Sequence, residues 1–295
     1  MIFFLSAMST NHMTKGNYVE ALQTLQTIIV NVDNVEKLLC LFDRAECQIK
    51  LKQCEIALVT ANEILSLIET NSSSNEFKNS IKKIELNVEN LVQSLNHIQQ
   101  TDFLILLVKC WIVLVKTFFE QHVFLSKLET ICLSISNITT ELINQVREKE
   151  IKEYFPLMDE ILEIIKCRPT KDVDLKMKCN SMANIMQIYG SCCNDASDWS
   201  KSIEIHNKAI TMKETACTDK EHCCQMLGHC YNNTGRAYSN LKKTEKARSC
   251  FEKAVRIYRN ATDYESEAAR QSDLRNSQQN LDLVDKKEAV FSPWG

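Results

Sequence analysis

The chain contains 295 residues with a net charge of −3, and only 5 of them are glycine and 3 proline. Glycine and proline supply the backbone angles of hairpins and tight turns, so this composition argues against an all-β sandwich or barrel. Phosphate-binding loops are also missing, because neither G-x-G-x-x-G nor G-x-x-x-x-G-K-[ST] occurs. The small net charge gives no general attraction to nucleic acid or to an anionic membrane, and we expect neither as a partner.

The placement of the 14 cysteines along the chain predicts that their thiols are reduced. Cys40, Cys47 and Cys54 recur every seven residues in an amphipathic helical pattern, where cysteine behaves as a small buried apolar residue. No C-x-x-C motif occurs, and the apolar run Ile2–Leu5 is shorter than the core of a secretory signal. We therefore expect a cytoplasmic protein.

Two helical hairpins are predicted near the N-terminus. Residues 38–65 contain two apolar helical stripes separated by a short polar turn near Lys52. Upstream, Gly16–Leu22 has the pattern of a turn followed by a second helix. Residues 2–13 would then form the first helix of that earlier hairpin.

A polar break at Asn71–Asn75 precedes an apolar stripe with alternating spacings of four and three residues. The stripe consists of Phe77, Ile81, Ile84, Val88, Leu91, Leu95 and Ile98. It fits either a coiled-coil seam, through which the chain would self-associate over 77–98, or a helix packed inside a solenoid.

The most apolar segment is 103–119, in which only Lys109 and Lys116 are charged. A membrane-spanning helix needs about 20 apolar residues and is opposed by a lysine near its centre. A central helix buried within a helical stack is therefore favoured over a membrane span.

Further helices are expected near 123–136, 139–153 and 157–167, and Arg168–Thr170 marks a second break. Beyond it, Met182–Tyr189 and Trp199–Ile210 have the pattern of a hairpin with an enlarged loop at 191–198.

The last hairpin, 231–258, has the clearest pattern. Tyr231, Gly235 and Tyr238 line its first helix, and its second helix is lined by Ala247, Phe251 and Ala254. Small residues let two antiparallel helices approach, and the large residues fill the space beside them. A polar, weakly amphipathic helix at 263–285 would follow as a cap that shields this last unit.

This alternation of small and large residues resembles the tetratricopeptide repeat family, whose helix–turn–helix unit has about 34 residues. Residues 38–65 resemble the same unit, with Gln48 in place of the usual aromatic residue and Lys52 in place of the turn glycine. Ala209 and Ala254 lie 45 residues apart, a longer period that resembles the repeats of the kinesin light chain. The resemblance implies an all-α fold, an α-solenoid of tetratricopeptide-like helix–turn–helix repeats.

We accordingly predict three parts. Residues 1–70 contain the N-terminal repeats, residues 76–168 form a helical middle segment, and residues 171–285 contain the C-terminal repeats with their capping helix.

In the family, the first helices line a concave groove that receives a peptide or a helix of another protein. On that resemblance, the residues that project into the groove here are Asn180, Asn184, Gln187, Asn232, Asn233, Arg236 and Asn240. Asparagine amides can bind a peptide backbone, and arginine can bind a carboxylate through two hydrogen bonds. In the N-terminal unit Asp43 replaces the asparagine of chaperone-tail-binding members, and their lysine-rich clamp is missing.

Charge is unevenly distributed along the chain. Residues 229–259 contain eight lysines and arginines against Glu245 and Glu252, whereas residues 1–70 contain five basic and eight acidic side chains. The basic C-terminal unit favours an acidic peptide as partner, although a solvated helix face would have the same composition.

Neither a metal site nor a catalytic site is predicted. The densest group of possible metal ligands is Cys217, His222, Cys223, Cys224, His229 and Cys230. Thr218 and Glu221 form a capping box that makes most of this segment helical, and it lacks the paired knuckle spacing of zinc sites. Asp159 and Glu160 are adjacent on a helix and point apart, so they cannot act on one bond. We expect no cofactor and no enzymatic activity.

The sequence thus predicts a non-catalytic adaptor or scaffold that binds a peptide or helix of another protein in the groove of its repeats. The alternative is a structural subunit of a multiprotein assembly that makes its contacts through helices 76–119.

Overall fold

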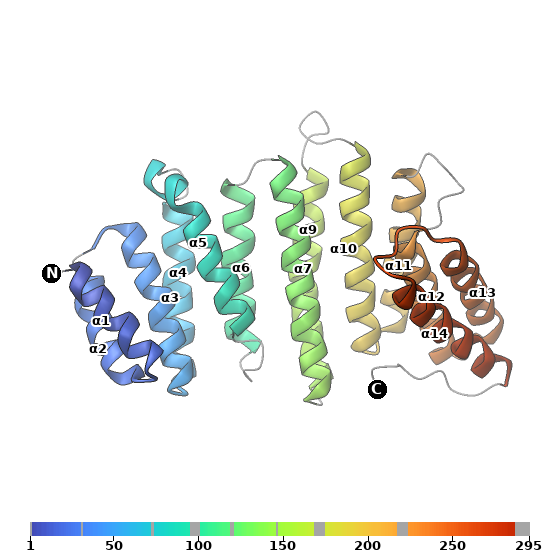
Figure 1. Cartoon of the computed structure of the whole chain (residues 1–295), viewed down its shortest axis with the longest axis horizontal. Coiled ribbons are helices and arrows are strands. Elements are labelled where there is room, and N and C mark those ends of the chain that lie inside the picture. Colours follow the sequence, from blue (N-terminus) through green and yellow to red (C-terminus); the bar gives the residue numbers. More distant parts are fainter. Residues whose placement is uncertain are drawn as a thin grey trace. The chain divides into compact units, whose positions relative to one another are not determined.

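The computed structural model describes residues 2–30, 32–71, 74–94, 101–118, 121–145, 147–167, 175–216 and 224–286. Every regular element in these ranges is a helix and none is a strand, which confirms the all-α class (Figure 1). The scarcity of glycine and proline accounts for this, because these two residues disfavour helix interiors most strongly.

The chain divides into two compact units, Met1–Ser134 and Ile135–Gly295. The first unit contains α1 (Ile2–Thr14), α2 (Tyr18–Ile29), α3 (Asn34–Lys50), α4 (Cys54–Thr70), α5 (Asn75–Ser94) and α6 (Thr101–Phe118). The boundary lies inside α7 (Gln121–Asn144). The division of the repeats into 1–70, 76–168 and 171–285 stays a prediction.

The second unit begins with the C-terminal part of α7 and continues through shorter and longer helices. These are α8 (Glu148–Ile151), the 3-10 helix η1 (Lys152–Tyr154), α9 (Phe155–Cys167), α10 (Leu175–Asp195), α11 (Trp199–Ala216), α12 (Gln225–Asn240), α13 (Thr244–Asn260) and α14 (Glu267–Asp285). From α10 to α14 each helix packs against the next one along the chain. The pairs α10–α11 and α12–α13 are the predicted helical hairpins.

The hairpin turns share one backbone conformation. In the α3–α4 turn, the N–H of Gln53 donates to the carbonyl of Gln48 at 2.8 Å, and Lys52, the residue before Gln53, adopts a left-handed conformation. This is the Schellman arrangement, which satisfies carbonyls at the end of a helix. The left-handed residues of the turns that follow α1, α3, α10 and α12 are Gly16 (φ 76°), Lys52 (60°), Ser197 (56°) and Lys242 (58°).

The core of the first unit is built around α6. Its side chains from Phe103 to Val115 are mostly buried, and the helix packs against α4 and α5. The expectation of a central buried helix at 103–119 is therefore confirmed. No described helix is long and apolar enough to cross a membrane.

The apolar stripe of α5 belongs to the same core. Phe77, Ile84, Val88 and Leu91 are buried, because α5 packs against α3 and α6. Of the two interpretations of the stripe, a helix packed inside a solenoid is therefore favoured in the described part, since the chain itself covers these side chains and they are not available as a seam for self-association through 77–98. Leu95 and Ile98 lie outside the described residues.

Two expected helix boundaries are also wrong. The segments 123–136 and 139–153 were expected as separate helices, but α7 is continuous to Asn144, because the polar Asn137 lies on its exposed side. The enlarged loop at 191–198 does not exist, because α10 continues to Asp195 and buries Cys192 and Cys193. The turn to α11 is as short as the other hairpin turns.

The last helix, α14, confirms the prediction of a helix within 263–285 that covers the final hairpin. Its N-cap is Ser266, whose Oγ accepts a hydrogen bond from the N–H of Ala269 at 3.2 Å. Val284 of α14 is buried against Ala247 and Phe251 of α13. The helix therefore covers apolar surface that α13 would otherwise expose.

Candidate functional site

The predicted groove residues all lie on the first helices of the two C-terminal hairpins. α10 carries Asn180, Asn184 and Gln187, whereas α12 carries Asn232, Asn233, Arg236 and Asn240. The two helices also contact each other directly.

Hydrogen bonds join α10 and α12 around Ser191. Its Oγ accepts from Asn233 Nδ2 at 3.0 Å and from Gln187 Nε2 at 3.2 Å. One turn further along α10, Asn194 Nδ2 donates to the backbone carbonyl of Asn233 at 3.1 Å. The structure thus brings Gln187 and Asn233 together, and we call the surface formed by Asn184, Gln187, Ser191, Asn233 and Arg236 the α10–α12 face.

Arg236 is the cation of this face. Its Nη1 donates to Asn233 Oδ1 at 3.4 Å, and no carboxylate forms an ion pair with it within the described residues. Burial lowers the pKa of the guanidinium, while the charge of Asp195 acts in the opposite direction. Arginine nevertheless stays protonated in proteins, so Arg236 holds a half-buried positive charge that Asp195 influences but with which no described carboxylate forms an ion pair.

Asn232 has a different role, because it contacts the capping helix. Its Oδ1 accepts from Ser277 Oγ at 2.8 Å and from Asn280 Nδ2 at 3.2 Å, both on α14. Its acceptor is therefore used within the protein. Sequence reasoning placed Asn232 beside Asn233, but helical geometry separates two consecutive side chains by about 100°.

A second set of hydrogen bonds fastens α14 to α12 through Asp273. Its Oδ2 accepts from His229 Nε2 at 2.9 Å, from Tyr264 Oη at 2.9 Å and from Gln225 Nε2 at 3.3 Å. Burial alone would raise the pKa of the Asp273 carboxyl, but these hydrogen bonds outweigh it and lower the pKa. Asp273 therefore stays ionised and holds the cap in place.

The remaining predicted residues lie apart from this network. Asn180 Oδ1 accepts from Lys213 Nζ of α11 at 2.9 Å, and Asn240 is exposed with its amide donating to the carbonyl of Arg236 at 3.0 Å. Asn184 is half-buried, and its side chain makes no hydrogen bond to any part of the chain that the structure describes.

Sequence reasoning missed Ser191 and Asn194, which it assigned to a loop. A helical signal was nevertheless present, because Asn184, Gln187, Ser191 and Asn194 are spaced by three or four residues. Extending the α10 pattern through the two cysteines would have placed all of these polar side chains on one face.

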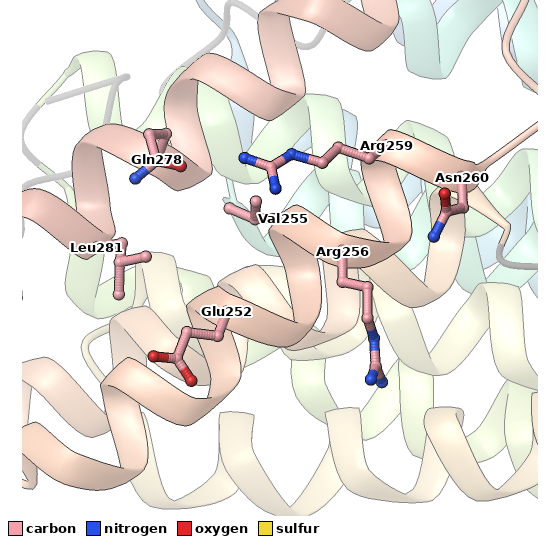
Figure 2. Close-up of a pocket in the computed structure, with 7 residues that line it drawn as sticks. All are labelled: Glu252, Val255, Arg256, Arg259, Asn260, Gln278 and Leu281. Atoms are coloured by element: carbon pink, nitrogen blue, oxygen red, sulfur yellow. The ribbon is translucent and has the colours of Figure 1, made fainter.

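A hollow of about 490 Å³ lies on another part of the second unit, between α13 and α14 (Figure 2). We call it the α13–α14 hollow, and its lining residues are Glu252, Val255, Arg256, Arg259, Asn260, Gln278 and Leu281. Figure 2 shows Arg259 extending from α13 in the direction of Gln278, whereas Arg256 points away from α14.

Metal ligands are not gathered anywhere in the described part of the chain, where no group of three or more His, Cys, Asp or Glu side chains is arranged to hold an ion. Cys217, His222 and Cys223 of the cluster considered above lie outside the described residues. Of its other members, His229 is engaged with Asp273, and Cys230 is buried.

Comparison with known proteins identifies the last hairpin. The family model described as tetratricopeptide repeat matches residues 228–260, which span most of α12 and all of α13. This hairpin is therefore a tetratricopeptide repeat, as its pattern of small and large residues predicted. The matched repeat is one helix–turn–helix unit within an all-α chain of helical hairpins.

Among solved structures, the TPR2AB-domain–pHSP90 complex of yeast Sti1 is similar at 15% identity, with 97% of this chain and 98% of that chain covered and a TM-score of 0.31. Comparison with curated protein sequences gives no significant match.

Proposed function

We propose that the chain is a non-catalytic adaptor or scaffold whose α10–α12 face binds a peptide or helix of another protein. The observation that carries this proposal is Arg236, a half-buried cation without an ion-pair partner among the described residues. A carboxylate of an acidic partner would balance its charge through two parallel hydrogen bonds.

The neighbouring amides suit the backbone of such a partner. Among the described residues, the side-chain amide of Asn184 has both an unused donor and an unused acceptor, and that of Gln187 is occupied only through its nitrogen. A peptide bond offers the complementary donor and acceptor, so these side chains can bind an extended or helical segment without reading its sequence. Asn180, Asn232, Asn233 and Asn240 contribute through the shape of the surface, because their amides are already engaged.

A cytoplasmic setting agrees with this proposal. The cysteines in the described ranges are all free thiols, and most are buried, as expected for a protein kept in a reducing compartment. The net charge of −3 gives nucleic acid and anionic membranes no advantage over a protein partner.

The alternative of a structural subunit that assembles through helices 76–119 has less support. Its main contact surface would have been the apolar stripe of α5, and most of the described part of that stripe is core.

The experiment compares partners of the wild type with those of the double variant Asn184→Ala/Arg236→Gln, by proximity labelling in the native cell. Asn207→Ala/Lys208→Gln on the exposed side of α11 is the matched control, since it removes the same groups elsewhere in the unit. We expect the principal partners to be lost from the first variant alone, and the affinity for an isolated partner to fall about tenfold.

Circular dichroism and thermal unfolding show whether both variants keep their fold. An unchanged partner set in a folded Asn184→Ala/Arg236→Gln variant would remove the α10–α12 face from the proposal.

A further inference from the structure

The α13–α14 hollow is lined by two arginines, Arg256 and Arg259. No carboxylate lies within ion-pair distance of Arg256 or Arg259 among the residues that the structure describes, although Glu252 lines the same hollow. Other arginines nearby are paired, since Arg248 contacts Asp285 at 3.0 Å and Arg270 contacts Glu267 at 2.8 Å. Within the described residues, the positive charge of the two arginines in the hollow is therefore not balanced by an ion pair.

The charge of α13 as a whole also favours an anionic ligand. This helix has five basic side chains against Glu245 and Glu252, within a chain whose net charge is −3. Both lysines of α13 lie over aromatic rings of α12, Lys253 over Tyr231 at 5.1 Å and Lys246 over Tyr238 at 5.6 Å. Arg256 and Arg259 are likewise exposed, and they line the hollow.

The floor of the hollow suits a carboxylate on a short apolar stem. Val255 and Leu281 supply the apolar surface, and Gln278 and Asn260 add amide groups at its edge. A glutamate side chain has this combination of methylene groups and a planar anion, which an arginine binds through two hydrogen bonds.

A phosphate fits less well. Glu252 brings a negative charge to the hollow, which opposes the higher charge of a phosphate more than that of a carboxylate. None of the described residues that line the hollow is aromatic, so they offer nucleic-acid bases no surface on which to stack.

We propose that the α13–α14 hollow is a second docking site, which receives a glutamate or aspartate side chain from an acidic segment of a partner protein. Arg259 binds the carboxylate, Arg256 contributes positive potential, and Val255 and Leu281 pack against the stem of the side chain. The site is separate from the α10–α12 face and does not depend on the function proposed for that face.

The test uses the full chain and a fluorescent peptide rich in glutamate and leucine. Its affinity is measured for the wild type, for Arg256→Gln/Arg259→Gln and for the matched control Lys242→Gln/Lys243→Gln, which removes the same charge from the turn before α13. We expect about a tenfold loss in the arginine variant and at most a small loss in the control. A photo-crosslinking residue at Gln278 should attach to the peptide in the wild type.

Further arms separate the other ligands. We measure in parallel the binding of three other ligands: the same peptide with glutamine in place of glutamate, a single-stranded RNA, and phosphatidylserine vesicles. The variant Arg236→Gln should leave peptide binding at the hollow unchanged. The proposal is overturned if the acidic peptide does not bind, if both double variants lose affinity equally, if crosslinking from Gln278 fails, or if only RNA or vesicles respond to the arginines.

Discussion

Gly190 of α10 lies directly against His206 of α11, because a Cβ atom on Gly190 would lie 2.5 Å from the imidazole ring. Gly235 and Phe251 make the same contact between α12 and α13, at the same separation in the sequence, and the corresponding distance there is 2.7 Å. In α3–α4 the equivalent positions are Ala45 and Ala61, both buried. The hairpins therefore share one packing site, filled by different pairs of residues.

This contact predicts that Gly235→Ala destabilises the protein. In most helix interiors alanine is more stable than glycine by up to about 1 kcal/mol, but here the added methyl group overlaps the ring of Phe251. We expect the free energy of unfolding in urea to fall by about 2 kcal/mol. Phe251→Leu in the same chain should restore part of the loss, and a Gly235→Ala variant more stable than the wild type would contradict the predicted overlap.

His206 predicts a loss of stability in acid. The residue is fully buried, and its Nδ1 lies 2.9 Å from the backbone carbonyl oxygen of Ser202. Burial lowers the pKa of the imidazole to about 4 from a usual value of 6.5. The unfolded chain therefore takes up the proton first as the pH falls. The free energy of unfolding is therefore unaffected by His206 above pH 6.5. It falls progressively between about pH 6.5 and 4, by up to about 3 kcal/mol.

The test of this prediction is urea unfolding of the wild type, His206→Phe and Phe251→His across that pH range. His206→Phe should lose the pH dependence that His206 contributes, because phenylalanine has no group that titrates. Phenylalanine should also fit this position, since Phe251 already packs beside Gly235 in the α12–α13 hairpin. Phe251→His should gain a similar dependence. Parallel pH curves for the wild type and His206→Phe would show that His206 is not the group that titrates.

The left-handed turn residues predict a stabilising change. Lys242 has a φ of 58°, a conformation that costs a residue with a Cβ atom about 1 kcal/mol or more and costs glycine little. We expect Lys242→Gly to raise the free energy of unfolding by up to about 1 kcal/mol, after the extra entropy of the unfolded chain is subtracted. Lys243→Gly is the control, since the φ of Lys243 is −94° and no gain is expected there. Equal effects at both positions would argue against relief of strain.

Glu85 links three helices in the core of the first unit. Its Oε1 accepts from Trp111 Nε1 at 3.1 Å, and its Oε2 accepts from Lys127 Nζ at 3.0 Å. Glu85→Ala would leave the buried indole N–H without an acceptor, which should cost about 2 kcal/mol of stability. Glu85→Gln keeps an acceptor for Trp111 and should cost less. Urea unfolding followed by tryptophan fluorescence measures both, and identical stabilities for the two variants would show that the indole hydrogen bond contributes little.

Local patterns in the sequence were enough to identify helices and hairpins. The small residue at Gly235 and the large one at Phe251 predicted the close packing of α12 and α13, and the apolar residues of 103–119 predicted a buried helix. These inferences succeed because the period of the apolar residues is a property of one helix and its nearest neighbour.

The same reasoning failed where the deciding contact comes from elsewhere in the chain. Gln48 occupies a position usually taken by an aromatic residue, and it is buried because its Oε1 accepts from Thr60 Oγ1 at 2.8 Å in α4. Asn232 seemed free to bind a peptide, but Ser277 and Asn280 of α14 use its amide oxygen. Neither partner is visible in the local sequence.

The 5 glycines and 3 prolines, together with the periodic apolar residues, thus determined that this protein is a helical-repeat chain. Only the tertiary structure decided which polar side chains remain available, since that depends on which helix covers each face. It left Arg236, Arg256 and Arg259 without ion-pair partners in the described residues, while it engaged Asn232 and His229 with the capping helix. The physical reason is that helix periodicity is local, whereas the pairing of polar groups depends on contacts between residues far apart in the chain.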